Sequence, residues 1–190
     1  MSAVADLLEE LRERGALQSG HFVLSSGRHS DRFVQKFRIL EDPKLLAPLA
    51  DALAAHFGAS VPTVVVSAAV GGILLGYEVA RALGIKAIFV EKEGGRPVLR
   101  RNFALTREDR ALVVEDVVTT GQSVMEVLQL VRERGAEIVG VGAIVRRAPA
   151  DFGVDTFSLL DLPMESYPPQ ECAQCKGGVP MTDPGSRRTA

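Results

Sequence analysis

Hydrophobic residues along the chain follow two periods, and segments of the two kinds alternate. Val124, Val127, Leu128 and Val131 recur at i, i+3, i+4 and i+7, which places them on one face of an α-helix. Helices are likewise predicted over residues 3–14, 43–56 and 72–82. Short apolar runs rich in β-branched residues predict buried strands at 63–67, 86–90, 111–114, 138–145 and 157–160.

Strands and helices alternate from residue 43 to residue 145, which predicts an α/β fold. Its centre is expected to be a mostly parallel sheet with right-handed crossovers, flanked by helices. Residues 21–39 combine short strand-like runs with a Ser/Gly turn, whereas residues 91–102 show no packed pattern. The last 25 residues or so are rich in Pro, Gly and polar residues and are expected to form a loop-like tail.

Composition narrows the class of protein. A chain of 190 residues, 46% hydrophobic, is expected to form one domain, or one domain with a small appendage. The net charge of −2 gives no reason to expect nucleic acid as a partner. No apolar run approaches a membrane span and no secretory signal opens the chain, so we expect no membrane association and a cytoplasmic location.

The most informative polar segment follows the predicted strand at 111–114. Glu115 and Asp116 stand where that strand ends, and residues 119–123 then supply three hydroxyls and a glycine just before a helix. The free N–H groups and the dipole of a helix N-terminus favour a phosphate, and Gly121 allows the backbone to approach it closely. Ionised carboxylates suit a pair of ribose hydroxyls instead. An ordinary capped helix explains the hydroxyls, but not the paired acids.

Two segments resemble a known family. Residues 115–123, Glu-Asp-Val-Val-Thr-Thr-Gly-Gln-Ser, resemble the phosphoribosyl-diphosphate (PRPP) motif of the type I phosphoribosyltransferases. Residues 22–33, Phe-Val-Leu-Ser-Ser-Gly-Arg-His-Ser-Asp-Arg-Phe, resemble the N-terminal signature of one branch, orotate phosphoribosyltransferase. The resemblance covers about residues 5–160 and continues into Pro-Gly-Ser-Arg at 184–187.

The resemblance implies the type I phosphoribosyltransferase fold and its domain organisation. Residues 1–165 would form a single domain, with residues 1–40 contributing a hood over the base, and residues 166–190 a C-terminal tail. The implied reaction joins orotate to PRPP and gives orotidine 5′-monophosphate and pyrophosphate, a step of pyrimidine synthesis. The implied PRPP-binding residues of the motif are Glu115, Asp116, Val117, Val118, Thr119, Thr120, Gly121, Gln122 and Ser123.

Two further segments match pyrophosphate-binding parts of the family. Residues 67–73 join a strand to a helix, and Val70 and Gly71 fall in the family's pyrophosphate loop, although close helix–strand packing is an alternative. Residues 91–101 look like the mobile loop that closes over a neighbouring subunit's active site in a homodimer. Lys92 matches a family lysine and, with Asp116, is the expected catalytic residue. A further family lysine and histidine are missing, so Arg96, Arg100 or Arg101 would have to substitute, and a solvated hairpin tip is the alternative.

The resemblance also implies a base site. Phe33 and Val34 are expected to contact orotate through their backbone, and Ser25 stands where some members have a lysine. Thr119 matches a threonine that contacts the base, and Arg147 matches the arginine that pairs with the orotate carboxylate. Mg²⁺ is expected to bridge pyrophosphate and ribose oxygens, with no ligand supplied directly by the protein.

Two other functions remain open at the level of sequence. A purine phosphoribosyltransferase would use the same PRPP motif, but purines have no carboxylate for Arg147. A PRPP-sensing regulator on this fold would bind RNA or DNA. The chain has no excess of basic residues and few aromatic ones, which argues against this function.

Cys172 and Cys175 form a Cys-x-x-Cys pair in the tail. A zinc site needs about four ligands, and the tail contains no histidine. We therefore expect a local disulfide or two free thiols, although two tails meeting in a dimer would supply four cysteines. His29 is given no catalytic role.

Overall fold

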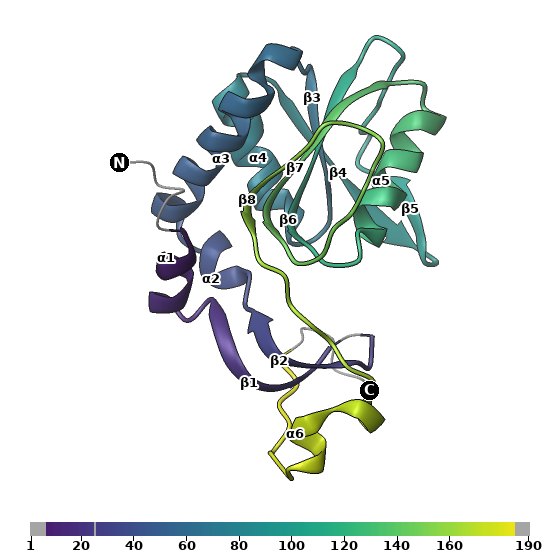
Figure 1. Ribbon diagram of the computed structural model, residues 1–190. Helices are drawn as coiled ribbons and strands as arrows, with labels where there is room; N and C mark the ends of the chain where they lie inside the picture. The colour runs from purple at the N-terminus through teal and green to yellow at the C-terminus, as the bar shows by residue number, and fades with distance from the viewer. Residues whose placement is uncertain (1–6, 25, 185–190) are drawn as a thin grey trace.

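A six-stranded sheet forms the centre of the protein (Figure 1). The computed structural model describes residues 7–24 and 26–184. The strand order is β5–β4–β3–β6–β7–β8. Their bounds are β3 Val64–Ala68, β4 Lys86–Glu93, β5 Arg96–Leu99, β6 Arg110–Val118, β7 Glu137–Arg146 and β8 Thr156–Asp161. β5 is antiparallel to β4 and the other pairs are parallel, which confirms the predicted α/β fold with a mostly parallel sheet.

Helices cover both faces of the sheet. α3 (Pro43–Phe57) and α4 (Gly72–Leu83) pack on one face, where they share a core with Val65. α5 (Gln122–Glu133) packs on the other face, against Val64 and Val66. Successive side chains of a strand point to opposite faces, so a strand buried on both sides must be apolar throughout. None of the described helices is long and apolar enough to cross a membrane.

A separate two-stranded hairpin lies beyond the carboxyl ends of the central strands (Figure 1). It consists of β1 (Leu17–Val23) and β2 (His29–Val34), in agreement with the predicted strand-like runs and turn. Within the described residues, the helix predicted over 3–14 is present as α1 (Leu7–Glu13). α2 (Phe37–Leu40) leads from the hairpin into the main domain.

Residues 91–102 contain no fully buried residue, in agreement with the predicted lack of a packed pattern, but they do form regular secondary structure. β4 continues to Glu93 and pairs with β5 in an antiparallel hairpin. The turn uses Gly94 and Gly95, both with positive φ (57° and 80°), as a tight two-residue turn requires. The apolar pattern is missing because the two strands are held here mainly by backbone pairing at the edge of the sheet.

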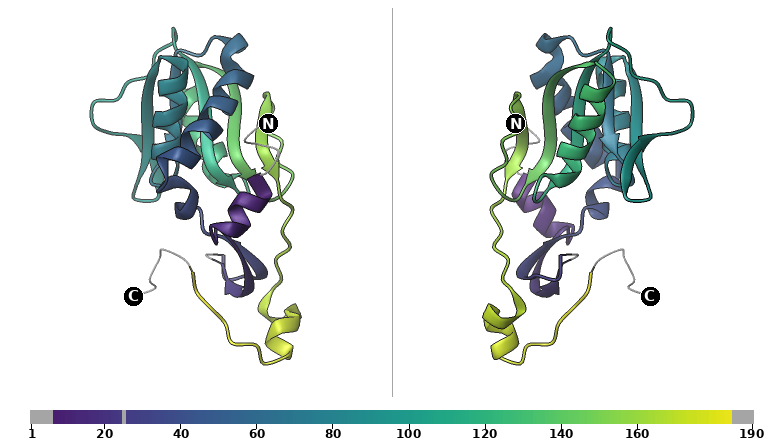
Figure 2. Two further views of the ribbon diagram at one scale, coloured as in Figure 1. Left: turned by 90° about the vertical axis from the view of Figure 1, so that its left-hand side faces the viewer. Right: turned by 90° about the vertical axis from the view of Figure 1, so that its right-hand side faces the viewer.

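The tail is also more ordered than predicted. It contains a 3-10 turn, η2 (Pro169–Glu171), and a short helix, α6 (Ala173–Lys176). From β8 the chain runs down past the β1–β2 hairpin to α6 and then returns (Figure 2). Backbone hydrogen bonds join Tyr167 to His29 in β2, and join Thr182 to His21 and Val23 in β1. Both edges of the hairpin are therefore paired with the tail.

Candidate active site

The carboxyl ends of β3, β6 and β7 meet at one edge of the sheet, because these strands are parallel neighbours. β6 runs to Val118, four residues past the predicted strand, since Glu115 pairs with Ala143 and Val118 with Arg146. The two acids therefore lie within the strand and not after it. This edge is where ligands collect in open α/β sheets.

Asp116 is paired with a lysine from outside the sheet. The Lys36 Nζ lies 2.9 Å from Asp116 Oδ2 and donates a hydrogen bond to Oδ1 at 3.2 Å. The backbone N–H of Val117 donates to the same Oδ1 at 2.7 Å. Asp116 is 2% exposed, and a buried carboxylate requires such partners. Lys36 directly precedes α2, so this ion pair joins the segment after the hairpin to the centre of the sheet.

Gly71 lies against this ion pair. A Cβ at this position would fall 1.9 Å from Asp116 Oδ2 and 2.4 Å from Lys36 Nζ, so no side chain fits there. The neighbouring Val70 is 72% exposed. The structure therefore brings the backbone of the predicted pyrophosphate loop onto the acidic end of β6.

Glu115 differs from Asp116 in its charge state. It is 8% exposed, and burial raises the pKa of its carboxyl to about 8, with the negative charge of Asp116 adding to the effect and the positive charge of Lys36 opposing it. At neutral pH Glu115 therefore carries a proton. It can donate a hydrogen bond to a hydroxyl while Asp116 accepts one.

The segment after β6 forms a small hollow at the start of α5. Glu115 and residues 117–124 line it. Gly121 has φ +78° and offers no side chain as a cap. The N–H of Gln122 makes only a long hydrogen bond to Thr120 Oγ1 (3.4 Å), so the first turn is weakly capped and can still bind a ligand in the hollow. The side chains of Thr119, Thr120 and Ser123 are exposed beside it. This arrangement can hold a phosphate group.

The β4–β5 hairpin carries basic side chains beside α5. Lys92 Nζ lies 2.6 Å from Glu126 Oε2, one turn into the helix. Arg101 pairs with Glu91 at 3.1 Å, and Arg96 is exposed. Lys92 is thus tied to the helix that opens on the hollow.

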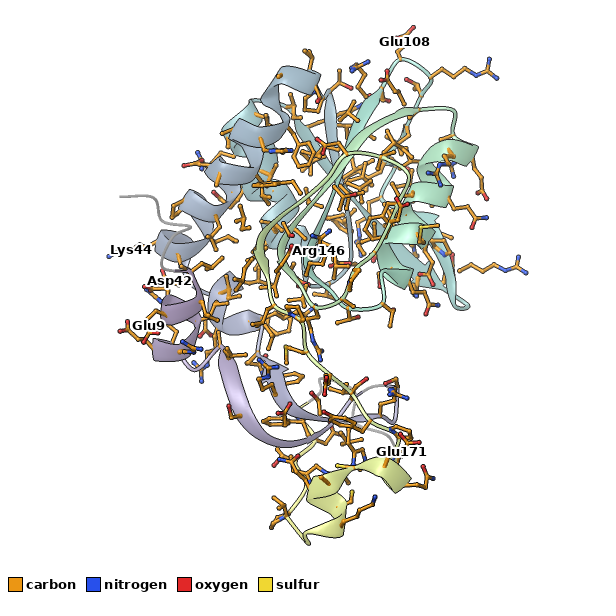
Figure 3. The ribbon with its side chains drawn as sticks, in the orientation of Figure 1. Glu9, Asp42, Lys44, Glu108, Arg146 and Glu171 are labelled. Atoms are coloured by element: carbon orange, nitrogen blue, oxygen red, sulfur yellow. The ribbon has the colours of Figure 1, made fainter. Side chains whose placement is uncertain are left out.

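Arg146 and Arg147 have different surroundings at the end of β7. Arg146, labelled in Figure 3, forms a two-pronged pair with Asp161 at 2.8 and 2.6 Å. Arg147 follows it, and its backbone N–H donates to Val118 O at 2.8 Å, which places it beside the start of the hollow. Its Nε is buried, with no hydrogen-bond partner among the described residues. Burial, reinforced by the positive charge of Arg32, lowers the pKa of the Arg147 guanidinium. A partly buried guanidinium that also feels the positive charge of Arg32 favours an anion as its partner.

The remaining predicted base contacts lie on the hairpin. Phe33 is half-buried and its ring packs against Phe22, with centroids 5.7 Å apart. Val34 is buried in the core. Ser25 lies outside the described residues.

Two residues of this edge were missing from the sequence prediction, Lys36 and Arg32. Both come from β2 or the segment directly after it, and reach the site through the packing of the hairpin against the sheet. Only one signal pointed to Lys36: a buried acidic pair needs a nearby cation, and this is the first lysine of the chain.

The chain is similar to known phosphoribosyltransferases over most of its length. Residues 38–156 match the phosphoribosyl transferase domain. The orotate phosphoribosyltransferase of Heliobacterium modesticaldum is 46% identical over 185 residues, covering 95% of this chain and 97% of that protein. The enzyme of the same name from Caldanaerobacter subterraneus subsp. tengcongensis is 45% identical over 184 residues, covering 96% and 97%.

Solved structures agree. The Mycobacterium tuberculosis H37Rv orotate phosphoribosyltransferase in complex with Fe(III) dicitrate superposes with a TM-score of 0.71 at 28% identity, covering 84% of this chain and 97% of that one. The adenine phosphoribosyltransferase of Thermoanaerobacter pseudethanolicus has a TM-score of 0.61 at 20% identity, covering 69% and 88%. The latter likeness concerns the fold alone.

Proposed function

The chain belongs to the orotate phosphoribosyltransferases, and we propose that the carboxyl edge of its sheet carries the transfer of the 5-phosphoribosyl group from PRPP to orotate. The products are orotidine 5′-monophosphate and pyrophosphate, and the step belongs to pyrimidine synthesis. The family assignment rests on the near full-length relatives and the domain match. The roles of individual residues follow from the geometry of the site.

The ribose 5-phosphate is proposed to lie along the end of β6. Its phosphate would occupy the hollow before α5 and take hydrogen bonds from residues 120–123. Its hydroxyls would meet Glu115 and Asp116. Because Glu115 carries a proton and Asp116 is paired with Lys36, one acid donates and the other accepts.

Pyrophosphate is proposed to lie between the loop at Val70 and Gly71 of one subunit and the basic β4–β5 hairpin of the partner subunit, in the homodimer proposed below. Gly71 allows the backbone to come close to the anion. Lys92 would exchange its contact with Glu126 for the pyrophosphate, and Arg96 is the exposed arginine at the hairpin turn. These cations would stabilise charge on the leaving group.

Orotate is proposed to lie between the hairpin and the end of β7. The observation that carries this assignment is Arg147, whose buried Nε has no hydrogen-bond partner within the described part of the chain and whose guanidinium is influenced by the positive charge of Arg32. A carboxylate would supply a hydrogen-bond acceptor for Arg147 and would neutralise the positive charge there. A purine has no carboxylate. Thr119 and the backbone at Phe33 and Val34 would contact the ring.

The chemical step needs no nucleophilic side chain. A ring nitrogen of orotate gives up its proton to solvent and attacks the anomeric carbon of the ribose. The new C–N bond forms, and the C–O bond to pyrophosphate breaks with its electron pair leaving on the phosphate oxygen. The ribose is oxocarbenium-like in between. The protein contributes by holding two anions in line and by placing positive charge on the departing group.

Mg²⁺ is proposed to accompany PRPP. Its preferred ligands are oxygens, and it keeps several waters. The carboxylates of Glu115 and Asp116 are oxygen donors at the right edge, and Asp116 is already paired with Lys36. The metal is proposed to be held through substrate oxygens, with no ligand supplied directly by the protein. The ion would supply neutralisation of pyrophosphate charge.

Two broader features are proposed as well. The protein is expected to act as a homodimer in which the β4–β5 hairpin of one subunit reaches the site of the other. The cytoplasm is the expected compartment.

The test is a base-consumption assay. Purified protein is incubated with PRPP and Mg²⁺ and with orotate, adenine or hypoxanthine in turn. We expect consumption of orotate alone, with release of pyrophosphate. Consumption of adenine or hypoxanthine but not orotate would contradict the base assignment, and no turnover with any base would favour a PRPP-binding regulator.

A further inference from the structure

Four side chains with metal-binding atoms converge at the end of the molecule opposite the central sheet. His21 comes from β1, His29 from β2, and Cys172 and Cys175 from the tail. One ligand atom from each lies within 4.8 Å of all the others. The first three residues are buried and Cys175 is exposed. In Figure 3 the labelled Glu171 marks this part of the tail, beside the β1–β2 hairpin.

Four of the six distances between these atoms are close to the edges of a tetrahedron around one ion, and the other two are at most 4.8 Å. His21 Nε2 lies 3.5 Å from Cys172 Sγ and 3.6 Å from Cys175 Sγ. His29 Nδ1 lies 3.2 Å from Cys175 Sγ and 3.1 Å from His21 Nε2. Zn–N bonds of about 2.0 Å and Zn–S bonds of about 2.3 Å imply edges of roughly 3.3 to 3.8 Å between ligands. The four distances fall within or just below this range.

The hydrogen bonding of His21 also suits a metal ligand. His21 Nδ1 lies 2.8 Å from the carbonyl oxygen of Val179, which can only accept a hydrogen bond. The proton of the ring is therefore on Nδ1, and Nε2 presents its lone pair to the cluster. Such a carbonyl partner on the far nitrogen is the usual arrangement behind a metal-bound histidine.

The backbone holds the ligands in place. Cys172 precedes α6 and Cys175 lies within it, so one short turn presents both sulfurs. His29 is fixed by its pair of backbone hydrogen bonds with Tyr167, both 2.8 Å. Gln174 Nε2 donates to the carbonyl of Gly20 at 3.0 Å, which seats α6 against β1.

We propose that His21, His29, Cys172 and Cys175 bind one Zn²⁺ ion within a single chain. Two thiols lose their protons on binding, so the two thiolates cancel the charge of the ion and the buried site is neutral. Two nitrogens and two sulfurs in a tetrahedron select zinc. All four positions are filled by protein, so the site is structural and joins the tail to the β1–β2 hairpin.

This proposal replaces the expectation for the cysteines. The described structure contains no disulfide, since both cysteines are free thiols. A second tail from a partner is not needed, because the missing ligands are histidines more than 140 residues earlier in the same chain.

The first experiment measures metal in the intact protein. Protein produced in zinc-supplied medium and passed through a desalting column is analysed by plasma mass spectrometry, with thiols counted under native and denaturing conditions. We expect one zinc per chain and two thiols that react with thiol reagents only after unfolding or chelation. Protein without zinc, protein with iron in its place, or a disulfide between the cysteines would overturn the proposal.

The second experiment locates the ion. Cys175→Ser and His29→Ala are expected to lose most of the zinc and to lower the Tm by several degrees. Two controls are His56→Ala, which removes the histidine outside the cluster, and Gln174→Ala, which weakens the seating of α6 without removing a ligand. Both controls should keep one zinc. Full zinc content in Cys175→Ser and His29→Ala would place the metal elsewhere.

A third measurement does not depend on the folding of the variants. Co²⁺ added to chelator-treated wild-type protein should give the intense visible bands of tetrahedral cobalt and a thiolate-to-cobalt charge-transfer band. The weak spectrum of octahedral cobalt would overturn the proposed ligand set.

Discussion

At the scale of single residues, Arg146 and Arg147 show how neighbours with the same side chain acquire different tasks. Arg146 is fully engaged with Asp161. Arg147 is held in a partly buried position with an unpartnered Nε and a second guanidinium nearby. The free positive charge at this edge is therefore at position 147.

Arg147→Ala is expected to raise the KM for orotate. The loss of a charge-assisted contact is worth roughly 1.5 to 3 kcal/mol, or about 10- to 150-fold in binding. Steady-state kinetics with varied orotate provide the measurement. Arg146→Ala is the matched control and should leave the KM for orotate nearly unchanged. Equal effects of the two substitutions would argue against the assignment.

Glu115→Gln is expected to change how stability depends on pH. The folded pKa of Glu115 is raised to about 8, above that of an unfolded chain. The native state then binds more protons than the unfolded state between these values, so stability falls as pH rises from about 5 to about 8. The glutamine variant lacks this decline. Urea unfolding at several pH values tests it, and parallel profiles for wild type and variant would refute it.

At the scale of elements, the packing of α3 on the sheet depends on Gly140 in β7. A Cβ there would lie 2.4 Å from Phe57 Cε1 and 3.0 Å from the carbonyl oxygen of Asp155. Phe57 is completely buried. The missing side chain is what lets the last residue of α3 enter the core.

Gly140→Ala is expected to destabilise the protein by about 1 to 3 kcal/mol, as overpacking of a core does. Gly58→Ala is the control, because φ is −57° at that position and nothing lies within 4 Å of the added Cβ. That variant should be as stable as the wild type or slightly more stable. Denaturant midpoints compare the two, and an unchanged midpoint for Gly140→Ala would show that Phe57 can shift freely.

Local patterns predicted most of the elements but not the contacts between distant ones. The face of α5 formed by Val124, Val127, Leu128 and Val131 is buried as its spacing indicates. The β4–β5 hairpin was foreseen only as the alternative of a solvated hairpin tip, because its strands are held by backbone pairing, which leaves little trace in the hydrophobic pattern. Lys36 was missed because nothing near it in sequence shows that it meets Asp116.

At the scale of the whole molecule, the β1–β2 hairpin is attached to the sheet through charge as well as packing. Lys36 is half-exposed, whereas Asp116 is buried. Replacing the lysine would therefore leave the buried carboxylate without its cation. The same pair stands beside Gly71. Stability and the proposed PRPP site therefore share this contact.

Lys36→Met is expected to lower the free energy of unfolding by on the order of 1 to 3 kcal/mol, because a buried acceptor loses its partner. Asp116→Asn in the same background should recover part of the loss, while impairing the use of PRPP more than the binding of orotate. A double-mutant cycle in urea measures the coupling. Additive effects of the two substitutions would show that the pair contributes nothing to stability.

The backbone pairing of the tail with the hairpin has a consequence for synthesis. β1 and β2 leave the ribosome well before the segments that pair with their edges, at Tyr167 and Thr182. All six strands of the central sheet end at Asp161 or before. The sheet can therefore form while the hairpin still has open edges. The hairpin reaches its final form only after the segment at Thr182 has been translated, so a chain interrupted before that point would hold a folded sheet beside an unfinished β1–β2 hairpin.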